Sequence, residues 1–190
     1  MGLRRHRIAA HGLARTFQNI RLFGGLSALD NVKVAAQRHA PVTILDILVR
    51  SRGYRDSERE TEERALEALD LVGLRNRAGD AATSLPYAQQ RLLEIARAVA
   101  GSPQILLLDE PAAGMNMTEA LLLLDIIQTL RRRIGITIIL VEHNVRLVMG
   151  ISDRVSVLDF GKKIAEGTPA EIQNDPAVIG AYLGRRRAHA

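Results

Sequence analysis

The chain has 190 residues, of which 47% are hydrophobic, enough for one globular domain with an apolar core. It contains no cysteine, which excludes disulfides, thiolate metal sites and cysteine nucleophiles, and no apolar stretch reaches the roughly 20 residues that span a bilayer. Much of the basic charge behind the net +5 lies in arginine clusters at 4–7, 131–133 and 185–187. Because no aromatic residues interleave with these clusters, we expect no nucleic-acid partner.

The first half of the chain is predicted to be mainly helical. Residues 1–23 form an irregular start that contains Gln18, and residues 41–55 are ambiguous, with a break at Gly53. Ser57 and Glu60 have the spacing of a capping box, which predicts the first turn of a helix that ends near Gly73. Helical patterns are thus expected over residues 26–38, 57–73 and 87–100.

From Gly101 onward, short apolar runs alternate with helical patterns. Strands are predicted at 105–108, 136–141 and 155–159, and helices at 118–133 and after His143. This alternation is typical of an α/β fold with parallel strands and right-handed crossovers. Residues 159–162 are predicted to form a hairpin turn that returns as a strand over 162–166, and Pro169 and Pro176 to begin short terminal helices.

The most informative motif is the apolar run at 105–108, which ends in Asp109 and Glu110. An apolar run of this kind predicts a strand buried on both faces of a parallel sheet. The two carboxylates then emerge at the C-terminal edge of the sheet, where open α/β sheets place their ligands. One carboxylate can hold magnesium while its neighbour polarises a water molecule.

Other motifs accompany this one in a fixed order. They are Thr16-Phe17-Gln18, Leu85-Pro86-Tyr87-Ala88-Gln89 with the helix after it, Ala113-Gly114-Met115-Asn116, and Glu142-His143 after a second apolar strand. This ordered set, together with Asp109 and Glu110, resembles the ATP-binding subunits of ABC transporters. In that family the corresponding segments are, in order, the glutamine loop, the signature, Walker B, the D-loop and the switch histidine. Residues 87–90, 113–116, 148–154 and 181–184 resemble the branched-chain amino acid importer subfamily.

The resemblance implies a fold and a division of the chain. The fold would be a partial P-loop NTPase core of the α/β class, with a parallel sheet and an inserted helical subdomain. Residues 1–25 would be a remnant of the core carrying the glutamine loop, 26–100 the helical subdomain ending in the signature helix, and 101–190 the C-terminal half of the core.

The same resemblance implies residue roles in binding ATP and magnesium. Glu110 would be the catalytic base or water-orienting group, and His143 would contact the terminal phosphate. Asp109 would hold magnesium directly or through water, and Gln18 would join the shell of magnesium and water. The nucleotide-binding residues would come from the signature and D-loop, namely Leu85, Pro86, Tyr87, Ala88, Gln89, Gly114 and Asn116.

The signature departs from the family pattern Leu-Ser-Gly-Gly-Gln. Pro86 removes the serine hydroxyl, a phosphate donor, and Ala88 replaces a glycine whose backbone approaches phosphate. A left-handed conformation at Ala88 would cost about 1 kcal/mol or more. Asn116 stands where the D-loop has aspartate, and Asn144 where aspartate often follows the histidine. We therefore expect a working but weakened signature.

No Gly-x-x-x-x-Gly-Lys-Ser/Thr sequence occurs in the 190 residues. In the family this phosphate-binding loop lies before the glutamine loop, so the chain resembles an ABC ATPase without its first segment. We expect the isolated chain not to hydrolyse ATP. Two alternatives stay open: a truncated, catalytically inactive interaction subunit or gene remnant, and a non-transport ABC-type ATPase acting on DNA, which the lack of sustained heptads disfavours.

The resemblance also implies partners and a location. A second ABC ATPase subunit, identical or not, would stack head to tail against this one, with ATP between them. Membrane permease subunits would receive the motion, and a periplasmic binding protein would act indirectly through them. The protein would then be cytoplasmic and peripheral on the inner face of the cell membrane.

Overall fold

A computed structural model describes residues 11–16, 19–37 and 51–183 of the chain. The chain divides into two compact units, Met1–Val141 and Glu142–Ala190. Within the described residues, no helix combines the length and the apolarity that crossing a membrane requires.

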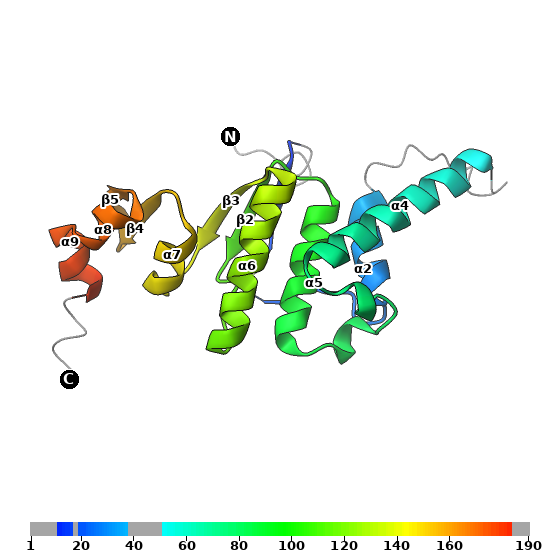
Figure 1. Cartoon of the computed structure of the whole chain (residues 1–190), viewed down its shortest axis with the longest axis horizontal. Helices are drawn as coiled ribbons and strands as arrows, with labels where there is room; N and C mark the ends of the chain where they lie inside the picture. The colour runs from blue at the N-terminus through cyan, green and yellow to red at the C-terminus, as the bar shows by residue number, and fades with distance from the viewer. Residues whose placement is uncertain (1–10, 17–18, 38–50, 184–190) are drawn as a thin grey trace. The chain divides into compact units, whose positions relative to one another are not determined.

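The first unit contains a three-stranded parallel sheet in the order β1-β2-β3 (Figure 1). The strands are β1 (Leu13–Arg15), β2 (Ile105–Asp109) and β3 (Thr137–Val141), and Asp109 is in register with Val141. The parallel pairing of β2 with β3 is confirmed. Strand β1 was not predicted, because a strand of three residues is too short to show an alternating hydrophobic pattern.

Strand β2 is not buried equally on its two faces. Leu106 and Leu108 are fully buried, whereas Ile105 and Leu107 are half-buried and their neighbour Ile139 on β3 is 48% exposed. The prediction of a strand buried on both faces is therefore wrong for the described residues. Helix α6 (Met117–Ile134) is drawn in front of the strands in Figure 1.

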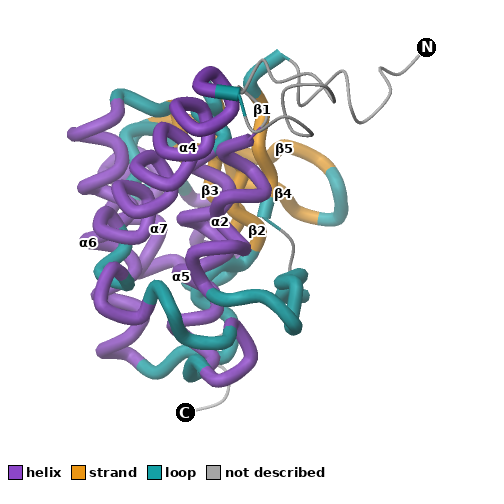
Figure 2. The backbone as a smooth tube through the Cα atoms, turned by 90° about the vertical axis from the view of Figure 1, so that its right-hand side faces the viewer, coloured by secondary structure: helices purple, strands orange, loops and turns teal. Residues whose placement is uncertain are grey.

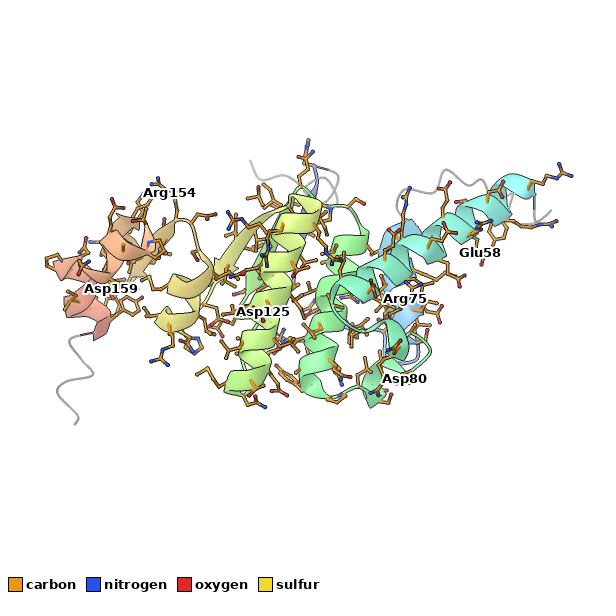
Figure 3. All side chains as sticks on the ribbon, in the orientation of Figure 1. Glu58, Arg75, Asp80, Asp125, Arg154 and Asp159 are labelled. Carbon is orange, nitrogen blue, oxygen red and sulfur yellow. The ribbon has the colours of Figure 1, made fainter. Side chains whose placement is uncertain are left out.

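The helical part of the first unit is built from α2 (Ala28–Ala36), α4 (Arg52–Leu71) and α5 (Tyr87–Ala100), joined by the short 3-10 helices Arg75–Arg77 and Ala82–Ser84 (Figure 2). The buried apolar residues here include Val32, Leu69, Leu93, Ile95 and Ala96. Charged residues such as Glu58 and Arg75 are exposed on the outside (Figure 3). The predicted predominance of helix over residues 26–100 is confirmed where the chain is described.

Helix α4 begins earlier than predicted. Ser51 caps it by accepting a hydrogen bond from the Tyr54 amide at 3.2 Å, so Gly53 lies inside the first turn. Ser57 lies within the helix, where its carbonyl accepts from the Thr61 hydroxyl at 2.8 Å. The predicted capping box at Ser57 is wrong, because Ser51 offers an earlier cap and the residues between them continue the helix. The predicted end is confirmed, with Gly73 at φ +74°.

Helix α6 was predicted within one residue at each end. Asn116 and Glu119 form a capping box at its start, and Gly135 ends it in the left-handed conformation. The arginine cluster 131–133 lies in the last turn, where cations suit the helix dipole.

The second unit contains an antiparallel hairpin. It comprises α7 (Val145–Ile151), β4 (Val155–Asp159), β5 (Lys162–Gly167), α8 (Pro169–Gln173), α9 (Pro176–Val178) and a π-helix at Ile179–Leu183. Phe160 and Gly161, with φ +45° and +78°, form the predicted two-residue turn. Strand β4 pairs with β5 in an antiparallel two-stranded sheet. The expectation that β4 also continues the parallel series stays a prediction, because it joins strands of two units. The unit's core is formed by Val155, Ile172 and Val178.

Candidate functional site

The predicted pair of carboxylates lies at the C-terminal end of β2, the central strand of the parallel sheet. Asp109 is the last residue of the strand, and its Oδ2 accepts a hydrogen bond from Nη2 of Arg15 at 2.9 Å. Arg15 ends the neighbouring strand β1 and pairs in register with Leu107, which places it on the same face as Asp109. The carboxylate predicted to serve magnesium is thus half of an ion pair.

Glu110 sits in a turn that is fixed by its backbone. Its φ is +45°, in the left-handed region, and its amide donates to the carbonyl of Val141 at 2.9 Å. Its own carbonyl accepts from the Ala113 amide at 3.1 Å. The turn therefore anchors Glu110 to the end of the adjacent strand β3. Consecutive carboxylates along one extended strand would alternate faces, and the left-handed residue breaks that alternation.

The signature residues lie at the start of α5. Leu85 is buried and its carbonyl accepts from Nε2 of Gln90 at 2.8 Å, while Pro86 is the N-cap and makes no side-chain cap. The first-turn amides of this 14-residue helix are therefore not capped by a Pro86 side chain, and its positive dipole end suits an anion.

Tyr87, Ala88 and Gln89 form the first turn of α5. Ala88 is not among the described residues with positive φ, so the strain considered for a left-handed Ala88 does not arise. Oε1 of Gln89 is buried and has no hydrogen-bond partner among the described residues. The predicted role of Gln89 in binding the nucleotide stays a prediction.

The D-loop residues Gly114 and Asn116 lie near the signature. Gly114 has φ +77°, and a Cβ placed on it would lie 3.1 Å from Cε1 of Tyr87. Asn116 caps α6, because its Oδ1 accepts from the Glu119 amide at 3.0 Å while Glu119 accepts from the Asn116 amide at 2.9 Å. The structure therefore brings the signature and D-loop together through Tyr87 and Gly114, and gives Asn116 a structural role.

His143 lies in the second unit, just before the Asn144 cap of α7. Its side chain is 73% exposed, and its Nδ1 is 4.0 Å from Oε2 of Glu142. The expectation that His143 meets Glu110 at one sheet edge stays a prediction, since it joins residues of two units. Gln18 lies outside the described residues.

The assignment of Asp109 to magnesium stays a prediction. Asp109 supplies a hard carboxylate oxygen of the kind that magnesium prefers. No group of three or more His, Cys, Asp or Glu side chains suited to a metal occurs among the described residues.

Sequence reasoning did not single out two charged contacts at this site. The first is the pairing of Arg15 with Asp109, which joins residues 94 apart in sequence. The second is Glu94, which is 2% exposed on α5 and faces Arg91. The available signal for the second was the spacing of Arg91, Glu94 and Arg97 at three-residue intervals on a helix.

Comparison with known families agrees with this architecture. The family described as "ABC transporter" matches residues 3–113. A second family, described as "Branched-chain amino acid ATP-binding cassette transporter", matches residues 162–188.

Similar proteins point the same way. The chain is 46% identical over 183 residues to the high-affinity branched-chain amino acid transport ATP-binding protein BraF of Pseudomonas aeruginosa, covering 96% of this chain and 72% of BraF. It is 43% identical over 183 residues to LivG of Escherichia coli, an ATP-binding protein of the same description, with the same coverage of both chains.

Among solved structures, the ADP conformation of MJ1267, an ATP-binding cassette of an ABC transporter, matches with a TM-score of 0.74 and 27% identity. This match covers 94% of the present chain and 70% of the other. The chain therefore belongs to the ATP-binding proteins of ABC transporters and carries the C-terminal segment of their branched-chain amino acid group.

Proposed function

We propose that this chain is the ATP-hydrolysing subunit of an importer for branched-chain amino acids. The observation that supports this most directly is the position of Asp109 and Glu110 at the C-terminal end of the central parallel strand. It occurs in a chain that is 46% identical to BraF, whose name describes a branched-chain amino acid transport ATP-binding protein.

In the proposed reaction, Glu110 accepts a proton from the attacking water or orients it in line with the leaving phosphate. The hydrogen bond from its amide to Val141 holds this residue at the strand edge before substrate arrives. Magnesium, when bound with nucleotide, neutralises phosphate charge, and Asp109 is the described residue that would hold it. His143 would contact the terminal phosphate.

The N-terminus of α5 supports the proposed role of the signature. Its first-turn amides and dipole would face the nucleotide held by a second ATPase subunit. Leu85 to Ala88 and Gly114 would form this contact. Through membrane permease subunits the assembly would lie at the cytoplasmic face of the membrane, and a periplasmic binding protein would deliver the substrate.

A direct test of the proposal is ATP hydrolysis. Because the 190 residues contain no Gly-x-x-x-x-Gly-Lys-Ser/Thr sequence, the assay uses a loop-extended chain, in which the strand, phosphate-binding loop and helix of an ABC relative precede Met1. We expect magnesium-dependent turnover. Glu110→Gln should lower kcat by about 10²- to 10⁴-fold and retain ATP binding, because it removes the proton acceptor and not the phosphate contacts.

Asp125→Asn is the matched control for this experiment, since Asp125 is an exposed carboxylate on α6 (Figure 3). It should leave turnover unchanged. Full activity of the Glu110→Gln variant would refute the assignment of Glu110.

An uptake assay tests which substrate is transported. In a Pseudomonas aeruginosa strain that lacks BraF, the loop-extended chain should restore leucine uptake, and the Glu110→Gln variant should not. ATP hydrolysis without leucine uptake would support the assignment as an ATPase and refute the assignment to branched-chain amino acids.

The second candidate is a catalytically inactive interaction subunit. In that case the chain as given binds no ATP, and the loop-extended chain shows no turnover.

A further inference from the structure

A buried carboxylate on α5 joins two segments that the proposed mechanism uses. Glu94 is 2% exposed and Arg91, one turn before it, is 3% exposed. Oε2 of Glu94 faces Nη1 of Arg91 at 3.5 Å, and Oε1 faces Nη2 of Arg97 at 3.9 Å. Burial raises the pKa of Glu94, while its hydrogen bond and the two arginines oppose that shift. A carboxylate this deep in the unit, with two cations beside it, does not serve to make the protein surface polar.

The same carboxylate reaches a different segment of the chain. The backbone amide of Arg21 donates to Oε1 of Glu94 at 3.2 Å. The guanidinium of Arg97 lies over the Phe23 ring, 5.7 Å from its centre. Residues 21–23, which follow the predicted glutamine loop, are therefore attached to α5 by a hydrogen bond and a cation–π contact.

Helix α2 holds this segment from its other end. Asn31 is fully buried, its Oδ1 accepts from the Phe23 amide at 2.8 Å, and its Nδ2 donates to the Phe23 carbonyl at 3.1 Å. The segment is thus bound to two helices of the helical part of the unit. We name this arrangement of Glu94, Arg97 and Asn31 around residues 21–23 the loop clamp.

The network continues toward the signature. Arg91, the partner of Glu94, donates from Nη2 to the Tyr87 hydroxyl at 3.2 Å, and its guanidinium lies 5.6 Å from the centre of the Tyr87 ring. Tyr87 is the aromatic side chain that Gly114 approaches. Contacts therefore run without interruption from the Arg21 backbone through Glu94 and Arg91 to Tyr87 and the D-loop.

We propose that Glu94 is a positioning residue: through the loop clamp it couples the segment that leaves the glutamine loop to the signature residue Tyr87. This inference rests on the proposed function, because it assigns consequences to the signature and the glutamine loop. A carboxylate suits the task because it offers two acceptor oxygens, one for the Arg21 amide and Arg97 and the other for Arg91.

The first test uses the 190-residue chain and reads hydrogen exchange at single amides. Glutamine has a single acceptor oxygen and two donors, so Glu94→Gln can satisfy Arg91 or the Arg21 amide and not both. We expect faster exchange of the Arg21 amide in Glu94→Gln. Thr61→Val is the matched control, since it removes a buried hydrogen bond to Ser57 within α4 and leaves the clamp intact.

A second variant separates positioning from stability. Replacing a buried ion pair by apolar residues of similar volume is often neutral for stability. The double variant Arg91→Met/Glu94→Met should therefore stay folded, as followed by circular dichroism, yet expose the Arg21 amide to exchange. Unchanged exchange of that amide in both the single and the double variant would overturn the proposal.

The functional readout is ATP turnover of the loop-extended chain. Coupling residues typically alter the linkage between sites by roughly 2- to 30-fold. We expect both clamp variants to lower kcat within that range while the KM for ATP stays within about twofold, because they replace none of the residues that are proposed to contact phosphate. Equal kcat losses in Thr61→Val and the clamp variants, at matched stability, would overturn the coupling. Absence of turnover in the unsubstituted loop-extended chain would refute the proposed function instead, and amide exchange alone would then decide whether the clamp exists.

Discussion

The contact between Gly114 and Tyr87 makes a quantitative prediction. Gly114 has φ +77°, and a methyl group placed there would lie 3.1 Å from Cε1 and 3.5 Å from Cζ of Tyr87. Gly114→Ala therefore imposes two costs, a left-handed alanine and a close contact. Gly73→Ala imposes the first alone, because Gly73 has φ +74° and no heavy atom lies within 4 Å of its added methyl.

The two costs can be estimated separately. A left-handed alanine costs about 1–2 kcal/mol, offset by about 0.4–1 kcal/mol from the restricted unfolded chain. We therefore expect Gly73→Ala to lower the free energy of unfolding by roughly 0–1.5 kcal/mol. Crowding of a packed site costs about 1–3 kcal/mol, and the lower end applies here because Tyr87 is 46% exposed and its ring can move. Gly114→Ala should thus cost about 1 kcal/mol more than Gly73→Ala.

Urea unfolding followed by circular dichroism gives both free energies, and a Tyr87→Ala background identifies the contact. With the ring removed, the excess cost of Gly114→Ala should vanish. If Gly114→Ala costs no more than Gly73→Ala, or if its excess persists without the ring, then Tyr87 and Gly114 do not make the contact described.

Three further predictions test other parts of the structure. Ser51→Ala should lower the free energy of unfolding by about 1 kcal/mol in urea titrations, because it removes the cap of α4, whereas Ser57→Ala should change it by less than about 0.5 kcal/mol. Ala88→Gly should preserve ATP turnover of the loop-extended chain, and a large loss of turnover would show that the methyl group is needed. Hydrogen bonds from the Thr168 amide and hydroxyl lower the pKa of Glu171 below its ordinary value of 4.5, so its carboxylate stabilises the second unit above that pH and the contribution is lost as the pH falls through the lowered pKa. The protection factors of the α8 amides, followed from neutral pH to about pH 3, should therefore depend less on pH in Glu171→Gln than in the unsubstituted chain. An unchanged pH profile of protection would contradict this.

The elements that the sequence predicted well are those with strong local signals. Helix α5 was predicted at both ends because Pro86 precedes a clear apolar stripe and Gly101 follows it. Strands β2 and β3 are apolar runs bounded by polar residues, and the hairpin of β4 and β5 has glycine at its turn. In each case the hydrophobic pattern and the residue that ends the element lie within a few positions of each other. The element can therefore be predicted from the local sequence.

The features that the sequence did not reveal depend on contacts between distant segments. Strand β1 is identified by its pairing with β2 and not by its own three residues. The ion pair of Arg15 with Asp109 and the hydrogen bond of Arg21 to Glu94 join residues 94 and 73 positions apart. The start of α4 was misplaced for a different reason: Ser57 and Glu60 have the spacing of a capping box, but Ser51 caps the helix earlier in the chain.

The left-handed backbone of Glu110 has an evolutionary consequence. At φ +45° a glutamate costs roughly 1–2 kcal/mol relative to a conformation that it prefers, whereas glycine and asparagine tolerate this region. Selection for stability alone would therefore replace the carboxylate with one of those two residues. A library screened only for thermal resistance should accumulate them at position 110, and a library screened for growth on an imported amino acid should purge them. With the proposed role of Glu110 in hydrolysis, the backbone of this turn places folding and chemistry under opposing selection at one codon.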